Sequence, residues 1–167
     1  MHSLARRNAG FTWIELLMVL AVLAILGAMA IPSMQDATIK KQVREALALA
    51  DVAKKGVQAA WNAAGEMPAD NAAAGAPPRE KIVGNFVRGV AVVDGAVTLT
   101  LGNNAAKPID GKRVTLRPAV MPGEAAVPIA WICHAVTVPA GMEVLGRDET
   151  DIPPKWLPVE CRGNAKE

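Results

Sequence analysis

One carboxylate, Glu15, lies near the start of an apolar run that extends from Gly10 to Pro32. A charged side chain in hydrocarbon costs several kcal/mol unless something compensates it, so an acid in such a run marks a functional site. The natural compensation is a cation held at the same depth. Glu15 is therefore the first candidate for a role in partner recognition.

The other reactive side chains form no catalytic constellation. His134 is the only histidine beyond the first ten residues, too few for a histidine-based triad or a zinc cluster. Asp148, Glu149 and Asp151 could donate oxygens to calcium, but calcium prefers six to eight oxygens from a regularly spaced loop. We therefore expect a sheet histidine, a solvated acidic turn, no metal, no cofactor and no enzymatic activity.

The distribution of charge argues against a nucleic-acid-binding protein. The formal charge of +2 comes from Arg6 and Arg7, because the first ten residues hold two of the 18 Lys and Arg and none of the 16 Asp and Glu. A basic body, typical of nucleic-acid binding, is absent. Three cations of one predicted strand could still meet DNA phosphates, although an ordinary exposed face is favoured: Lys112, Arg113 and Arg117.

The apolar segment is long enough to cross a membrane. Residues 11–31 would form a helix of about 30 Å, the thickness of a bilayer core. The basic residues precede this segment, which places the remainder of the chain across the membrane. A secretory signal has its cleavage site after the apolar part, and no such site follows here. Cleavage at Gly10 would instead leave the apolar segment on the mature protein.

The sequence of residues 10–15, Gly-Phe-Thr-Trp-Ile-Glu, resembles the prepilin-peptidase site of type IV pilins and their pseudopilin relatives. The resemblance implies cleavage after Gly10 and N-methylation of Phe11. Pro32 stands where the family has a helix-interrupting proline, which implies a kink. The sequence departs from the commonest family pattern at Trp13, Ala24 and Met34.

The same resemblance gives Glu15 a role in assembly. In the family, this carboxylate is thought to pair with the terminal amine of Phe11 of a neighbouring subunit. A pair within one subunit is an alternative, because Glu15 lies one helical turn from the new amine. A plain signal anchor would need neither the glycine nor the acid.

Beyond Pro32 the pattern becomes amphipathic, which predicts a helix that continues to about residue 64. Its apolar positions are spaced by three and four residues: Ile39, Val43, Leu47, Ala50, Val57 and Trp61. We expect three parts: a cleaved leader, 1–10; an N-terminal helix, 11–64, whose first half is the membrane and fibre-core segment; and a globular head, 65–167.

The head contains four apolar runs, residues 85–93, 96–101, 112–117 and 128–134. Asp94-Gly95 between the first two is a strong hairpin signal. Alternation places one set of side chains against the helix: Val97, Leu99, Leu101, Val114 and Leu116. It places another set outward: Thr98, Thr100, Arg113, Thr115 and Arg117. This predicts an α+β fold, with a long helix packed against a small four-stranded antiparallel sheet.

Two cysteines, Cys133 and Cys161, are an even number in an exported chain, which favours a disulfide over two buried thiols. The bridge would tether a C-terminal stretch, 138–167, that is rich in Pro and Gly and is expected to be mostly loop. This arrangement resembles the disulfide-bounded region of type IV pilins, and it favours a pilin over a pseudopilin.

These features predict a type IV pilin precursor, processed by prepilin peptidase, held in the inner membrane and polymerised by the assembly machinery into an extracellular helical homo-oligomer. The resemblance implies roles in attachment, twitching motility and DNA uptake. The alternative within the family is a pseudopilin or minor pilin of a type II secretion system. A membrane-anchored protein with a periplasmic ligand-binding head is the alternative from another class.

Overall fold

The computed structural model describes residues 10–163, apart from the side chains of residues 29–33. Residues 1–9, which make up most of the expected leader, lie outside the described part. The chain divides into two compact units, Met1–Ala37 and Thr38–Glu167.

Helix α1 (Trp13–Leu49) begins in the first unit. Every residue from Gly10 to Ala28 is exposed, including large apolar side chains such as Phe11 and Trp13, each 75% exposed. Helix α1 continues through position 32. A kink is expected at Pro32, whose side chain lies outside the described part of the structure.

In the second unit, the rest of α1 is followed by α2 (Asp51–Ala64). Ala50 between them keeps helical backbone angles, φ −61° and ψ −24°. Gly65 ends α2 in the left-handed conformation, φ 68°, and its amide donates to the carbonyl of Trp61 at 2.8 Å. One face of the two helical segments is buried at Ile39, Val43, Ala46, Ala50, Ala53, Val57 and Trp61.

The sheet consists of β1 (Val87–Val93), β2 (Ala96–Leu101), β3 (Arg113–Val120) and β4 (Ala130–Cys133), in that order, with every pair antiparallel. A two-residue strand, β5 (Glu143–Val144), also pairs with β3. The turn between β1 and β2 has positive φ at both Asp94 and Gly95, as its sequence predicts. Short 3-10 turns complete the unit: η1 (Arg79–Lys81), η2 (Lys107–Ile109), η3 (Pro154–Trp156) and η4 (Val159–Cys161).

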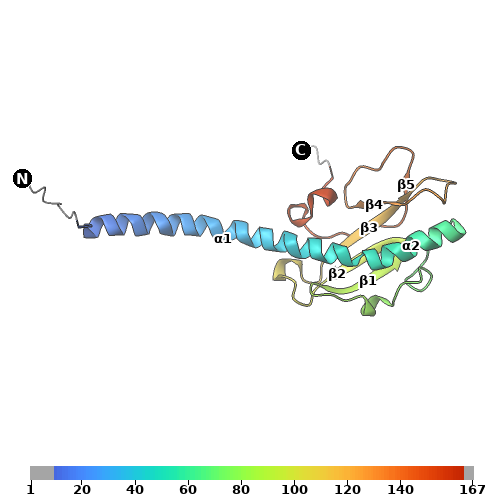
Figure 1. Ribbon diagram of the computed structural model, residues 1–167, viewed down its shortest axis with the longest axis horizontal. Coiled ribbons are helices and arrows are strands. Elements are labelled where there is room, and N and C mark those ends of the chain that lie inside the picture. The colour runs from blue at the N-terminus through green and yellow to red at the C-terminus, as the bar shows by residue number, and fades with distance from the viewer. Residues whose placement is uncertain (1–9, 164–167) are drawn as a thin grey trace, which may run out of the picture. The chain divides into compact units, whose positions relative to one another are not determined.

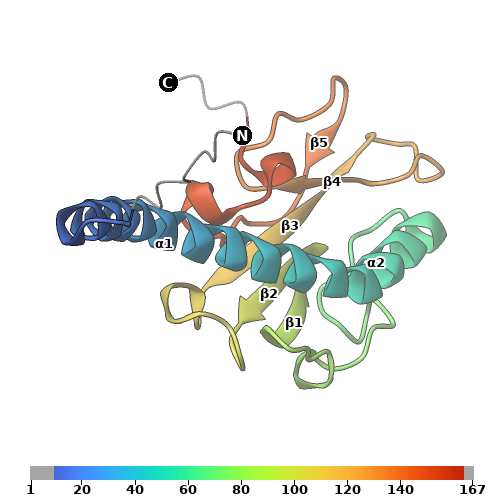
Figure 2. The same ribbon diagram turned by 60° about the vertical axis from the view of Figure 1, so that its left-hand side comes forward.

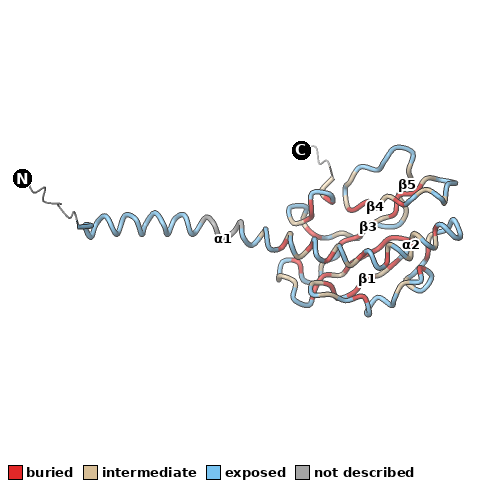
Figure 3. Tube along the Cα trace, viewed as in Figure 1, coloured by how far each residue is buried: buried red, intermediate tan, exposed pale blue. Residues whose placement is uncertain are grey.

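The core lies between the helices and one face of the sheet (Figures 2 and 3). Val97, Leu99 and Leu101 of β2 are completely buried there, as predicted. The apolar side chains that recur every three or four residues on the helices therefore pack against those that alternate along the strands, in one apolar layer. The predicted α+β fold is confirmed by the long N-terminal helix and the antiparallel sheet (Figure 1). The predicted C-terminal disulfide is also present.

The opposite face of the sheet differs from the expectation. Thr98 and Thr115 were predicted to point outward, and they do lie on that face, but they are only 7% and 0% exposed. Residues 148–151 hydrogen-bond to this part of β3, with the amide of Glu149 donating to Thr115 Oγ1 at 3.2 Å. The expectation of a solvated outer face is therefore wrong at these two threonines.

Candidate functional site

The predicted processing site lies where α1 begins. Gly10 and Phe11 are exposed and precede the helix, which starts at Trp13. The amide of Glu15 donates to Thr12 Oγ1 at 3.3 Å. Thr12 therefore caps the helix, in the Thr-x-x-Glu pattern typical of a capping box. This role of Thr12 was absent from the sequence interpretation, although the spacing of Thr12 and Glu15 signals it.

Glu15 itself is exposed in the first turn of α1. A carboxylate at this position interacts favourably with the partial positive charge at a helix N-terminus. The described side chains around it, from Phe11 to Leu26, are mostly large, apolar and exposed. An exposed apolar surface of this extent is typical of a segment that contacts other chains or lipid.

Helix length and hydropathy bear on the expected membrane span. Within the described residues, no helix is both long enough and apolar enough to cross a membrane. The expected span, 11–31, extends into residues 29–33, whose side chains are not described.

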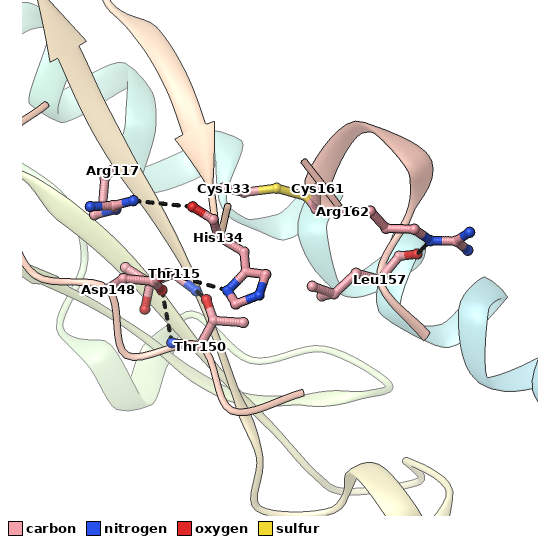
Figure 4. The surroundings of a disulfide bond; sticks show 9 residues. All are labelled: Thr115, Arg117, Cys133, His134, Asp148, Thr150, Leu157, Cys161 and Arg162. Carbon is pink, nitrogen blue, oxygen red and sulfur yellow. Dashed lines mark hydrogen bonds and ion pairs between the residues drawn. A yellow bond between two sulfur atoms is a disulfide. The ribbon is translucent and has the colours of Figure 1, made fainter. Parts of the chain in front are cut away.

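The predicted disulfide is present. Cys133 at the end of β4 is bonded to Cys161 in η4, with 5.0 Å between their Cα atoms (Figure 4). Both cysteines are buried. Next to the bridge, Arg162 Nε donates to the carbonyl of Leu157 at 2.8 Å. The bridge holds the last described turn against the sheet, and this hydrogen bond connects Arg162 to the preceding turn of the same segment.

A polar cluster lies beside the bridge (Figure 4). His134 follows Cys133 with a positive φ of 50°, and its carbonyl accepts a hydrogen bond from Arg117 at 3.1 Å. Its Nδ1 lies 3.4 Å from Asp148 Oδ2. That nitrogen is buried without a well-formed hydrogen bond, so the attraction is that of an ion pair when the imidazole is protonated.

The environment of Asp148 acts on its pKa in two directions. Partial burial of the carboxyl raises the pKa, but hydrogen bonds from the side chain and amide of Thr150 and the charges of Arg117 and His134 lower it. The net effect is a pKa below the ordinary value. Asp148 is thus held as a carboxylate within the protein.

Three further charged residues of this region also have partners within the protein. Arg113 NH1 lies 3.1 Å from Glu149 Oε2, and the amide of Arg113 donates to Asp151 Oδ1 at 2.6 Å. Within residues 10–163, no three or more His, Cys, Asp or Glu side chains are grouped to hold a metal. The cluster therefore fastens the C-terminal segment to β3, and two of the three cations considered for DNA contacts have partners here.

Comparison with known proteins gives two family matches. Residues 40–162 match the pilin family, described as a bacterial filament. Residues 5–31 match the prokaryotic N-terminal methylation motif. The second match includes the Gly10–Glu15 region, and the first includes both cysteines.

Individual relatives are also pilin or fimbrial proteins. The chain is 38% identical to a type IV major pilin protein of Neisseria gonorrhoeae over 162 residues, which cover 93% of this chain and 88% of the relative. It is 33% identical to a fimbrial protein of Neisseria meningitidis serogroup B, over 92% of this chain and 93% of that relative. It is also 33% identical to the fimbrial protein EcpC of Eikenella corrodens, over 93% of this chain and 92% of that relative.

The predicted resemblance to type IV pilins is confirmed by these matches. The methylation motif fits a pilin precursor, and the relatives carry pilin or fimbrial names, so the secretion-system alternative finds no support. By the match over most of its length, the chain belongs to the pilin family of bacterial filament subunits.

Proposed function

We propose that this chain is the precursor of a type IV pilus subunit, cut by prepilin peptidase between Gly10 and Phe11 and then N-methylated on Phe11. The observation that carries the proposal is the methylation motif over residues 5–31, followed directly by an exposed apolar helix with Glu15 as its acid. Relatives named as type IV major pilins support the assignment. The chain acts as a structural subunit and not as an enzyme.

Before assembly, residues 11–31 hold the subunit in the inner membrane, with Arg6 and Arg7 on the cytoplasmic side. The hydropathy of this run and the preceding basic residues support that orientation. The parts of the protein are then a leader, 1–10, a helix, 11–64, and a head, 65–167. In the fibre the apolar helices pack together, the heads form the outside, and the fibre serves attachment, twitching motility and DNA uptake.

Glu15 takes part in fibre growth by pairing with the methylated amine of Phe11 in a neighbouring subunit. Pairing relieves two charges that would otherwise be buried singly. Pro32 kinks or loosens the helix.

Mass spectrometry of the purified mature protein tests the processing. The expected N-terminus is methylated Phe11, and the mass is two hydrogens below that of the reduced chain because of the disulfide. An intact Met1 terminus in a cell with active prepilin peptidase would refute the proposal.

A pair of variants separates the assembly role of Glu15 from its place in the capping pattern. Glu15→Ala should be cleaved normally but form no regular fibres, whereas Thr12→Val removes the cap acceptor and keeps the charge. Fibres are scored by electron microscopy and cleavage by immunoblot. If Thr12→Val fails in the same way as Glu15→Ala, capping and not charge pairing explains the effect.

A further inference from the structure

Charged side chains of the second unit, Thr38–Glu167, sort to its two ends along the helical axis. The acidic end carries five exposed carboxylates: Glu66, Asp70, Asp94, Glu124 and Glu143. The basic end carries five cations, exposed or half-buried: Lys40, Lys41, Arg44, Lys107 and Lys112.

The acidic end is assembled from segments that are distant in sequence. Glu66 and Asp70 follow the end of α2, and the β1–β2 turn joins them because the amide of Asp94 donates to the carbonyl of Ala69 at 3.2 Å. Glu124 belongs to the loop that returns to α2, where the amide of Ile129 donates to Gln58 Oε1 at 2.8 Å.

Glu143 completes the acidic end, because it pairs in β5 with Val120 at the end of β3. One cation, Arg147, follows Gly146, whose Cα lies against Ala96 at the start of β2. The five carboxylates therefore leave this end clearly negative.

The basic end lies around the start of the helical segment of this unit. Lys40, Lys41 and Arg44 are on α1, and the loop of Lys107 is fastened beside them because the amide of Ala106 donates to Gln42 Oε1 at 2.9 Å. The carbonyl of Lys112 accepts from the amide of Leu101, where β2 ends. Glu45 is also exposed here, and Arg88 is paired with Asp110 at 2.7 Å, so the end remains positive.

These ten charges can meet a partner, although Asp70 Oδ1 already accepts a hydrogen bond from the amide of Ala73 at 2.8 Å. Among the described residues, none of the ten lies within 4.0 Å of an opposite charge, whereas Arg88, Arg113 and His134 do. The helical stretch from Lys41 to Ala64 is about 35 Å long at about 1.5 Å per residue, so the two ends cannot meet within one chain.

We propose that the acidic end of one head contacts the basic end of the head of a second copy of this chain. Two different patches that meet head to tail form a heterologous interface, which generates an open helical filament when the rotation does not close. This inference rests on the proposed function as a fibre subunit. It adds a contact between heads to the contact between apolar helices.

The contact sets orientation and register and supplies little of the total affinity. Each exposed ion pair stabilises by about 0 to 1 kcal/mol, and salt screens it over about 8 to 10 Å. Several such pairs repeat at every subunit of a fibre. Because like charges in the same place repel, a head in the wrong orientation is disfavoured.

Charge reversal in the full-length protein tests the contact in cells that carry the assembly machinery. One variant makes both ends acidic: Lys41→Glu, Arg44→Glu and Lys107→Glu. The other makes both ends basic: Glu66→Lys, Glu124→Lys and Glu143→Lys. Among the described residues, none of these six side chains has a hydrogen bond or ion pair. Lys55→Glu with Lys81→Glu is the control outside both ends, because Lys55 lies within α2 and Lys81 belongs to η1, beside β1.

Each end variant alone should yield about a tenfold lower mass of sheared fibres than the parent, and the control should match the parent. Co-expression of the two variants should restore fibres that contain both, because an acidic end then meets a basic end at every contact. A misfolded variant would not be rescued in this way.

Parent-like fibres from both single-end variants would overturn the contact, as would failure of the mixture when both subunits accumulate with intact disulfides. The behaviour of the parent chain distinguishes a failure of the contact between heads from a failure of the proposed function. If the parent itself forms no fibres or keeps residues 1–10, the function fails. If the parent assembles and the reversals have no effect, only the contact between heads fails.

Discussion

The carboxylate of Asp148 lies 3.4 Å from His134 Nδ1, and the two residues come from segments on either side of a long loop. His134 directly follows β4 and the bridged Cys133, whereas Asp148 belongs to the segment that hydrogen-bonds to β3. This contact, together with the hydrogen bond from the amide of Thr115 to Thr150 Oγ1, fastens the C-terminal segment to the sheet in addition to the covalent bridge.

Acid should weaken this fastening. The pKa of Asp148 is lowered in the folded protein, so its contribution to stability is complete above its ordinary pKa of 3.8 and is lost as the pH falls through the folded value. Asp148→Asn should be less stable than the parent at pH 7, and the difference should shrink toward pH 3. Urea denaturation of the detergent-solubilised protein at several pH values measures it; a constant difference would contradict the assignment.

Gly56 should tolerate no side chain. Replacing an interior helical glycine with alanine ordinarily stabilises by about 1 kcal/mol. Here a Cβ on Gly56 would overlap the carbonyl oxygen of Ala74, so the clash decides the sign. Gly56→Ala should lower the free energy of unfolding by about 1 to 3 kcal/mol.

The exposed neighbour Lys55 provides the control for that substitution, since Lys55→Ala should change the stability by less than about 0.5 kcal/mol. Thermal melting of both variants compares them. A stabilised Gly56→Ala protein would show that the loop of Ala74 moves away without cost.

Two buried threonines provide a matched comparison. Thr98 and Thr115 share a hydrogen bond of 3.0 Å, and the Thr115 hydroxyl also accepts from the amide of Glu149. Thr115→Val should destabilise by about 1 to 3 kcal/mol because it leaves two donors or acceptors without a partner. Thr98→Val removes only the shared bond and should cost less, and equal losses in urea denaturation would contradict this reasoning.

Removing the bridge should cost more than any of these changes. The Cys133–Cys161 bond closes a loop with a sequence separation of 28 residues, which predicts a stabilisation of about 3 to 4 kcal/mol from loop entropy. Cys133→Ala with Cys161→Ala should therefore melt well below the parent without reductant. With reductant present, the parent should approach the double variant, and a persistent difference would assign the effect to packing instead.

Local signals account for the parts of the fold that were predicted. Asp94-Gly95 fixed the first hairpin, Gly65 followed the end of α2, and alternation in β2 gave its buried face. Each depends on the conformational preference of one or two residues or on a period within a single element. The N-terminal site was recognised for the same reason, as a short contiguous motif.

The missed features depend on contacts that are distant in sequence. Thr115 reads as an outward strand residue, and nothing near it signals that residues 148–151 cover it. Strand β5 has two residues, too few to show a period, and its pairing with β3 is set by the path of the preceding loop. The opposed charged ends likewise form only when α1, β5 and loops that are distant in sequence come together.

The bridge also changes what a protease can do to the head. Exposed residues such as Thr137, Val138 and Ala140 lie between Cys133 and Cys161. A single cut there leaves both fragments joined by the sulfur bond, and the part beyond the cut remains hydrogen-bonded to β3 through Thr115. A subunit nicked in this region therefore stays one molecule until a reductant reaches the bridge.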